Sequence, residues 1–230
     1  MRLSKFIAAS GYSSRRQADV LIENGFVIVN NTICRDFSKD IIEEDEVIVE
    51  NTLINLQNPR LWLFYKPKGY LCTNNDPMGR RTIFDILPPK LPRLLSVGRL
   101  DLHSEGLLLL TNNGEVSRFF ELPKNKIERS YQVNLVGSLS SKDLAIMNKG
   151  VSIKGINYGP INSKVIKKIK NKFTLELTLN EGKNREIRNI AEYFEWKILK
   201  LKRIRYGSYA LGDMKEKEII EVNFKQQNLY

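Results

Sequence analysis

The sequence predicts an α+β fold in two parts, a small module over residues 1–58 and a larger domain over residues 59–230. The chain has 230 residues, more than most single domains and fewer than two of full size. Apolar residues make up 42% of it, enough to fill a core, so a disordered chain is excluded. The predicted strands and helices alternate irregularly rather than in repeated βαβ units, which favours α+β over a doubly wound sheet.

The chain is basic, and its charge is unevenly spread. Lysine and arginine number 37 against 26 acidic residues, a formal net charge of +11. Residues 1–50 hold 6 basic and 9 acidic side chains, whereas residues 163–205 hold 13 basic and 5 acidic ones. Such basic density is typical of proteins that contact a phosphate backbone, although a lysine-rich genome would also produce part of it. We therefore expect a polyanionic partner.

Composition excludes several classes of protein. The longest apolar run, over residues 106–110, is far short of the ~20 residues of a membrane span, and the N-terminus lacks the apolar segment of a signal peptide. Two cysteines, Cys34 and Cys72, cannot build a disulfide scaffold and are expected to be small core residues. Together with the single histidine, His103, they are too few for a zinc site. We expect a reduced, cytoplasmic protein with no membrane or metal partner.

Two short helices are expected at the N-terminus. Residues 3–8 place apolar side chains at helical spacing until a Ser-Gly pair ends the helix. Ser13 or Ser14 can cap a second helix over residues 15–24, and Gly25 is suited to close it.

Short strands and a linker are expected next. Residues 26–29 are rich in β-branched side chains and precede an Asn-Asn pair typical of a hairpin turn, after which Ile33 resumes the strand. Residues 46–50 give the last strand of the module. The polar stretch over residues 51–60 is predicted to be the linker.

The larger domain is predicted to mix strands with an amphipathic helix. Strands are expected over residues 61–65, 106–110, 129–136 and 173–179. The second of these is entirely apolar, as is typical of a strand buried on both faces. A helix is expected over residues 185–194, and its buried face would consist of Ile187, Ile190, Ala191 and Phe194.

Asp101 is the candidate functional carboxylate. It stands beside Arg99 and shortly before the apolar strand, at the edge of the expected core. A carboxylate in that position is partly desolvated and needs a cation or hydrogen bonds. Taken alone, the pattern is also what a structural Arg–Asp ion pair would give, and it identifies no reaction.

Residues 98–114, Gly-Arg-Leu-Asp-x-x-Ser-x-Gly-Leu-Leu-Leu-Leu-Thr-x-x-Gly, resemble the catalytic motif of RNA pseudouridine synthases, in the branch that modifies single uridines of ribosomal RNA. Three other stretches follow the order of that branch: Tyr-Lys-Pro-Lys-Gly at 65–69, Glu-Arg-Ser-Tyr-Gln-Val at 128–133 and Asn-Glu-Gly-Lys-Asn-Arg-Glu-Ile-Arg at 180–188. Ser104 stands where the family usually has Thr, which keeps the hydroxyl. The resemblance implies a catalytic domain with a mixed, mostly antiparallel sheet flanked by helices.

The N-terminal module resembles the small alpha-L RNA-binding motif. The shared features are an opening Arg-Leu, a Ser-Arg-Arg before an alanine, and an Ile-x-x-Gly-x-Val. In that motif two helices present basic residues to RNA phosphates, although a helical hairpin could also leave its arginines merely solvated. The RNA contacts implied by position are Arg2, Lys5, Ser14, Arg15 and Arg16.

The resemblance also implies roles within the site. Asp101 would act on the sugar or the base of the uridine, either as a nucleophile or as a base. Arg188 would pair with Asp101 and hold its orientation, and Tyr131 would stack on the uracil and take part in proton transfer. Isomerisation involves no redox change and no hydrolysis, so no cofactor or metal is implied, and the target base has to flip out of its helix. Further RNA contacts are expected at Lys66, Arg80, Arg99, Lys183, Arg185, Arg203 and Arg205.

The expected substrate is 23S rRNA, and the expected state is a monomer. Residues 75–80 and 203–207 resemble features of a subgroup that acts on large-subunit ribosomal RNA. A synthase for small-subunit 16S rRNA is the nearest alternative, and a non-catalytic rRNA-binding assembly factor would share the same basic surface. A metal-dependent nuclease would need clustered carboxylates, which are sparse around Asp101.

Overall fold

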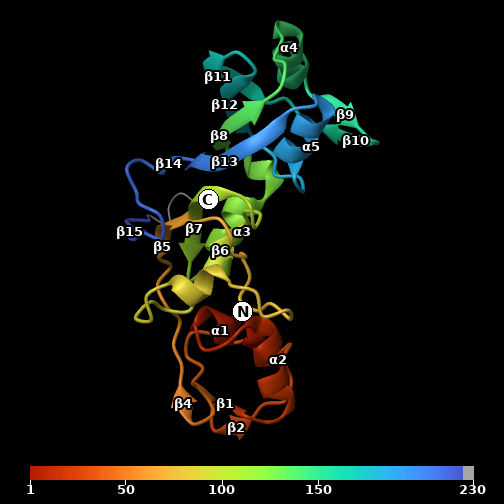
Figure 1. Cartoon of the computed structure of the whole chain (residues 1–230). Helices are drawn as coiled ribbons and strands as arrows, with labels where there is room; N and C mark the ends of the chain where they lie inside the picture. Colours follow the sequence, from red (N-terminus) through yellow and green to blue (C-terminus); the bar gives the residue numbers. More distant parts are fainter. Residues whose placement is uncertain (225–230) are drawn as a thin grey trace.

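A small N-terminal module lies at one end of the molecule and a larger domain at the other, as Figure 1 shows for the computed structural model. The structure describes residues 1–224. The module consists of α1 (Leu3–Ala9), α2 (Arg15–Glu23), β1 (Val27–Val29), β2 (Thr32–Ile33), β3 (Val47–Val49) and β4 (Thr52–Leu53). Its strands are antiparallel in the order β2-β1-β3-β4 and share one apolar core with the two helices.

The ends of α2 are set by its sequence as predicted. The Ser14 hydroxyl accepts a hydrogen bond from the backbone N–H of Gln17, and the Gln17 side chain accepts one from the backbone N–H of Ser14. This reciprocal capping box satisfies two donors that the helix itself cannot. Gly25 follows the helix with a φ of +79°, a conformation that glycine adopts without strain.

The predicted linker over residues 51–60 is wrong at its beginning. Residues 52 and 53 form β4, which pairs with β3, and Ile54 is buried in the module core. The turn between β3 and β4 has both central residues, Glu50 and Asn51, at positive φ, as the Asn30–Asn31 turn does. Such a turn favours Asn or Gly, and the glutamate at its first position hides this second hairpin from sequence inspection.

The larger domain is built on a mixed sheet, which confirms the predicted α+β class. Its order is β11-β12-β8-β13-β7-β5-β15, with β14 beside β13 and β6 beside β7; every pair is antiparallel except β13 with β7. The strands are β5 (Leu61–Lys66), β6 (Leu95–Val97), β7 (Glu105–Thr111), β8 (Arg129–Val136), β11 (Asn162–Ile169), β12 (Lys172–Leu179), β13 (Lys197–Tyr206), β14 (Tyr209–Ala210) and β15 (Ile219–Val222). Strands β9 (Val151–Ile153) and β10 (Ile156–Tyr158) form a separate two-stranded ribbon. The helices are α3 (Gly114–Glu121), α4 (Ser141–Lys149) and α5 (Glu186–Tyr193), and the 3-10 turns are η1 (Ile83–Ile86) and η2 (Pro123–Asn125).

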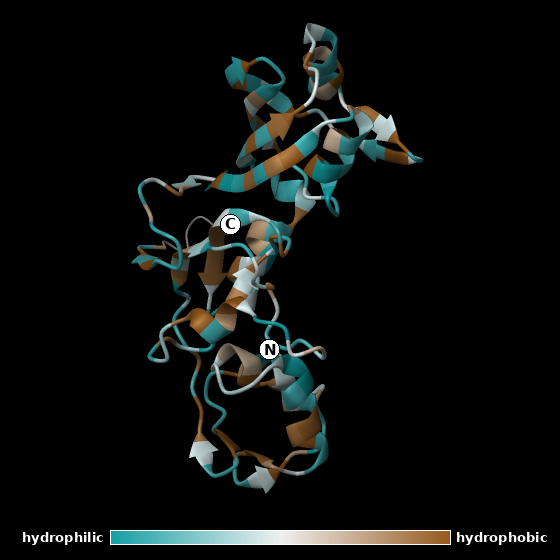
Figure 2. Ribbon diagram, in the orientation of Figure 1, coloured by the Kyte–Doolittle hydropathy of each residue, from teal (hydrophilic) through white to brown (hydrophobic). Residues whose placement is uncertain are grey.

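The sheet has two halves, each with its own core. The half made of β8, β11, β12 and β13 packs with α4 and α5 over one apolar cluster. In the other half, β7 is buried at every position, and its alternate side chains enter two clusters on opposite faces. Figure 2 shows β7 as an almost uninterrupted hydrophobic strand, as predicted for a strand buried on both faces.

The two halves meet where β7 runs beside β13. The parallel register there pairs Glu105 with Lys202 and Gly106 with Arg203. Gly106 has a φ of +105°, and a Cβ added to it would lie 2.2 Å from the carbonyl oxygen of Arg203. Only a residue without a side chain allows the two backbones to approach so closely.

We therefore expect Gly106→Ala to destabilise the protein by about 3 kcal/mol, because backbone strain and overpacking add at this position. Urea unfolding of the full chain measures the effect. Gly155→Ala is the matched control, because Gly155 also has a positive φ but no atom within 4 Å of an added Cβ. Its cost should be about 1 kcal/mol. Equal costs for the two variants would contradict the close-approach argument.

Candidate active site

A buried lysine holds in place the loop between β6 and β7 that carries Asp101. Lys66 is fully buried, and its ammonium donates to the backbone carbonyls of Pro67, Asp101 and Ser104 at 3.0, 3.2 and 2.9 Å. Burial lowers the pKa of the Lys66 ammonium, while the nearby Asp101 carboxylate acts in the opposite direction. The prediction that Lys66 contacts RNA is wrong, because all three of its donors are used inside the protein.

Cys72 also holds the loop that carries Asp101 in place. Its sulfur accepts a hydrogen bond from the Leu100 N–H at 3.4 Å and lies 3.5 Å from the Leu100 carbonyl oxygen. Burial raises the pKa of the Cys72 thiol, so it stays protonated. Cys72 is thus a small core residue, as expected, and one that also orients the residue before Asp101.

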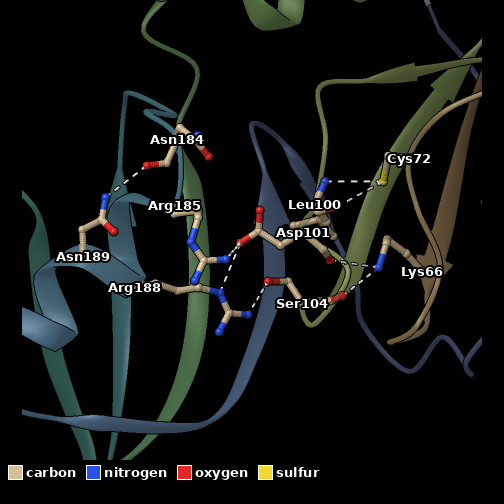
Figure 3. Close-up of polar contacts among 9 residues, drawn as sticks. All are labelled: Lys66, Cys72, Leu100, Asp101, Ser104, Asn184, Arg185, Arg188 and Asn189. Carbon is tan, nitrogen blue, oxygen red and sulfur yellow. Dashed lines mark hydrogen bonds and ion pairs between the residues drawn. The ribbon is translucent and has the colours of Figure 1, made fainter. Parts of the chain in front are cut away.

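Two arginines reach Asp101 from the opposite side, as Figure 3 shows. Arg188 Nε lies 3.1 Å from Asp101 Oδ2, and its Nη2 donates to the Ser104 hydroxyl at 3.0 Å. Arg185 Nη1 is 3.9 Å from the same carboxylate oxygen. The predicted contact between Arg188 and Asp101 is present, and Arg185, expected to face only RNA, is also directed toward Asp101.

Helix α5 places these arginines at the site. Its apolar face, with Ile187, Ile190 and Ala191, is buried against the core under β8 and β13. Arg188 follows Ile187 directly and emerges at the edge of that face, with 17% of its side chain exposed. The site is therefore assembled across the junction, with the carboxylate on one half of the sheet and the arginines on the other.

Asp101, Arg188 and Tyr131 line one cleft of about 1260 Å³ between the two halves of the sheet. Tyr131 is half-buried on β8 and packs against apolar clusters of both halves. Asp101 keeps 35% of its side chain exposed, so it can be reached from this cleft. The cleft thus holds a reachable carboxylate, a guanidinium that fixes it and a flat aromatic ring.

Arg203, predicted to contact RNA, is instead buried. It is 3% exposed, its Nε donates to the Leu107 carbonyl at 2.7 Å, and its guanidinium lies over the Tyr206 ring. This position faces the sheet junction, where Arg203 also lines the cleft that holds Asp101 and its Nη2 has no partner within the described residues, so its contact with RNA stays a prediction. Arg203 holds β13 against β7.

The other basic candidates of the larger domain lie near the surface. The Arg80 guanidinium donates two hydrogen bonds to the Asp76 carboxylate and lowers the pKa of that carboxyl to about 2. Lys183 pairs with Glu181 at 2.6 Å. The remaining exposed candidates are Arg99 and Arg205.

In the module, two of the five candidates have partners inside the protein. Lys5 forms an ion pair with Glu115 of α3, which ties the module to the larger domain, and the Ser14 side chain is used in the helix cap. The exposed candidates are Arg2, Arg15 and Arg16.

Glu105 is a buried carboxylate that sequence inspection missed. It accepts hydrogen bonds from the Tyr65 hydroxyl at 2.9 Å and from Lys200 at 2.8 Å. Burial acts to raise the pKa of Glu105, but the hydrogen bonds from Lys200 and Tyr65 outweigh it and lower the pKa. The only signal was an acid inside the catalytic motif, at a position that this motif does not specify.

The cleft with its reachable carboxylate is that of an enzyme, and comparison with known proteins gives its family. Residues 60–193 match the RNA pseudouridylate synthase family and residues 1–47 match the S4 domain. The chain belongs to the RNA pseudouridylate synthase family, which isomerises uridine to pseudouridine in RNA, and its alpha-L-like module is an S4 domain.

Relatives and a solved structure agree with this assignment. The chain is 44% identical to an uncharacterised RNA pseudouridine synthase of Rickettsia felis over 97% of each chain. It is 32% identical to the ribosomal large subunit pseudouridine synthase B of Bacillus subtilis, over 94% of this chain and 91% of that one. A crystal structure of a pseudouridylate synthase superimposes with a TM-score of 0.68 at 28% identity, covering 100% of this chain and 98% of that chain.

Metal-binding clusters and membrane-spanning helices are both absent from residues 1–224. No group of three His, Cys, Asp or Glu side chains is arranged there to hold a metal ion. In the same part of the chain, every helix is too short or too polar to cross a membrane.

Proposed function

We propose that this enzyme converts a specific uridine of 23S rRNA to pseudouridine, with Asp101 as its catalytic carboxylate. The observation that carries the proposal is the Asp101 carboxylate, one-third exposed in the cleft and contacted by Arg188 at 3.1 Å. The similarity to the ribosomal large subunit pseudouridine synthases B of Bacillus subtilis and Haemophilus influenzae, at 32% and 34% identity, supports the large subunit as the source of the RNA. Such a substrate also agrees with a cytoplasmic enzyme.

In this reaction the bond between base and sugar breaks, the base turns, and a carbon atom of the base is joined to the sugar. Asp101 acts on the sugar or the base in this sequence, as a nucleophile or as the base that removes a sugar proton. Arg188 holds the carboxylate in its orientation, and Tyr131 stacks on the uracil and transfers a proton. Because Asp101 lies inside a cleft, the nucleotide flips out of its helix at a cost of a few kcal/mol.

Basic side chains offset this cost by binding the phosphates on either side of the flipped nucleotide. A second hollow of about 740 Å³, which shares Arg99 with the cleft, runs along α3 and also contains Arg118. Beyond α3 the S4 domain is attached through Lys5 and Glu115. This arrangement supports an RNA path from the cleft along α3 to the exposed arginines of α2.

The experiment that tests the function is incubation of the full chain with 23S and 16S rRNA transcripts, without added metal, followed by mapping of pseudouridine. Modification at one position of 23S rRNA is the expected result. Modification of 16S rRNA alone would move the substrate to the small subunit. Binding of both RNAs without any modification would favour the assembly factor.

A charge-removal variant tests the RNA path in the S4 domain. Arg15→Gln with Arg16→Gln should weaken RNA binding and make the slope of log K against log salt shallower by about 0.7–0.9 for each phosphate that the variant no longer binds. Lys142→Gln with Lys149→Gln, on α4 at the opposite end of the molecule, removes the same charge and should leave the slope unchanged. Identical slopes for the two double variants would contradict a role of α2 in RNA binding.

A further inference from the structure

Glu186 is a buried carboxyl group beside the catalytic arginines that the proposed chemistry does not use. It is the first residue of α5, directly after Arg185, and is 3% exposed. Its Oε2 accepts a hydrogen bond from the Lys183 N–H at 3.0 Å. Within the described residues, its Oε1 is buried and has no donor. A buried carboxylate with a bare oxygen is costly, so this group needs a proton or a further partner.

A second carboxyl group, that of Glu181, acts on Glu186: both side chains line the cleft, and both accept hydrogen bonds from Lys183. Glu181 accepts a hydrogen bond from the Gly159 N–H at 2.7 Å and forms an ion pair with Lys183 at 2.6 Å. Lys183 also donates to the Asn157 carbonyl at 2.6 Å. These contacts tie the loop that precedes α5 to the end of β10.

Within residues 1–224, Lys183 is the one cation that forms an ion pair with either carboxylate. Strand β10 contributes a backbone carbonyl and the phenol of Tyr158, both of which contact Lys183. Strand β9, which also packs on α5, has no charged residue. Of the other charged groups on the surrounding elements, Arg185 and Arg188 reach Asp101, whereas Arg129 and Arg203 donate to backbone carbonyls. Two like charges at such short range cannot both persist in a buried site, so one proton is retained.

We propose that Glu186 and Glu181 share one proton and act as positioning residues. This proton fixes the loop at residues 180–185, which carries Arg185 and leads into α5 with Arg188, so that both arginines reach Asp101. The inference rests on the proposed role of Asp101. Loss of the proton sets two carboxylates against each other at the start of α5, and the loop moves the arginines away from the site.

The pH at which the proton is lost lies near neutrality. Burial and the Glu181 carboxylate raise the pKa of Glu186 to about 7. Because the folded pKa is above the unfolded one, the folded state binds more protons between pH 4.5 and 7, and stability falls as the pH rises through this window. Above pH 7, the stability that this proton contributes is fully lost.

The test compares Glu186→Gln with the wild type in the full chain, by thermal unfolding and by turnover of the rRNA transcript. Glutamine has the shape of a protonated carboxyl group and donates to Glu181 at any pH. From pH 5.5 to pH 8.5, we expect the unfolding temperature of Glu186→Gln to gain several °C on that of the wild type. Over the same range kcat of the wild type should fall by about 10-fold, whereas kcat of Glu186→Gln should change less than about twofold.

Two further variants separate positioning from a general effect on the helix. Glu192→Gln removes an exposed carboxylate from the same helix and should keep the wild-type dependence on pH. Glu186→Ala should lose both stability and turnover at every pH, because the Lys183 N–H then loses its acceptor and Glu181 loses the group that shares the proton. An unfolding temperature of Glu186→Gln that follows the wild type across the pH range would overturn the inference. An inactive wild type would count against the proposed function alone, since the unfolding temperatures still test the shared proton.

Discussion

Replacement of Asp101 by asparagine should abolish uridine isomerisation while leaving RNA binding within a few-fold of the wild type. The amide keeps the shape of the side chain and accepts a hydrogen bond from Arg188, but it has neither the negative charge nor the basicity that the reaction needs. We expect kcat to fall by at least ~10³-fold, because a group that acts directly on the reacting atoms is lost. The measurement is pseudouridine formation in single-turnover assays, with the dissociation constant determined on the same RNA.

The control for this variant comes from the same loop. His103, two residues away, is exposed and is not expected to take part in the reaction. His103→Asn should keep kcat within about twofold, which shows that substitutions in the loop are tolerated. Turnover by Asp101→Asn above a hundredth of the wild type would remove Asp101 from its proposed role, and a loss as large in His103→Asn would indicate a disturbed loop instead.

Patterns with a short-range physical cause were readable in the sequence. The apolar strand before which Asp101 stands, the strand over residues 129–136 and the cap of α2 depend on neighbours in the chain, and all three are present as predicted. The contact between Arg188 and Asp101 could be predicted only because the family resemblance joins two motifs that are far apart in the chain.

What sequence inspection missed depends on which backbone groups meet in space. Lys66 and Arg203 look like surface cations in the sequence, but each finds carbonyl acceptors inside the protein, at the Asp101 loop and at β7. Glu186 differs from both, because its Oε1 has no donor within the described residues and its neighbour Glu181, five positions away, belongs to a loop. Which groups surround a buried charge depends on the fold, and composition gives no sign of this.

Replacement of Arg188 by alanine should lower kcat by about 10²-fold, because Asp101 then loses the group that orients it. The cost in stability should be only about 1 kcal/mol, because water reaches the Asp101 carboxylate, 35% of whose side chain is exposed, and replaces part of the hydrogen bonding that Arg188 supplied. Single-turnover kinetics and urea unfolding measure the two effects on the same samples.

Two further substitutions show whether the geometry of Arg188 or only its charge is needed. Arg188→Lys keeps the charge but cannot contact the Asp101 carboxylate and the Ser104 hydroxyl together, as the guanidinium does at 3.1 and 3.0 Å, so kcat should fall by about 10-fold. Arg185→Ala removes an arginine that lies 3.9 Å from the same carboxylate and is half exposed, and it should mainly weaken RNA binding in a salt-dependent way. If Arg185→Ala lowers kcat as much as Arg188→Ala does, the carboxylate responds to total positive charge rather than to one oriented partner. If Arg188→Lys has the kcat of the wild type, the planar fork is not required.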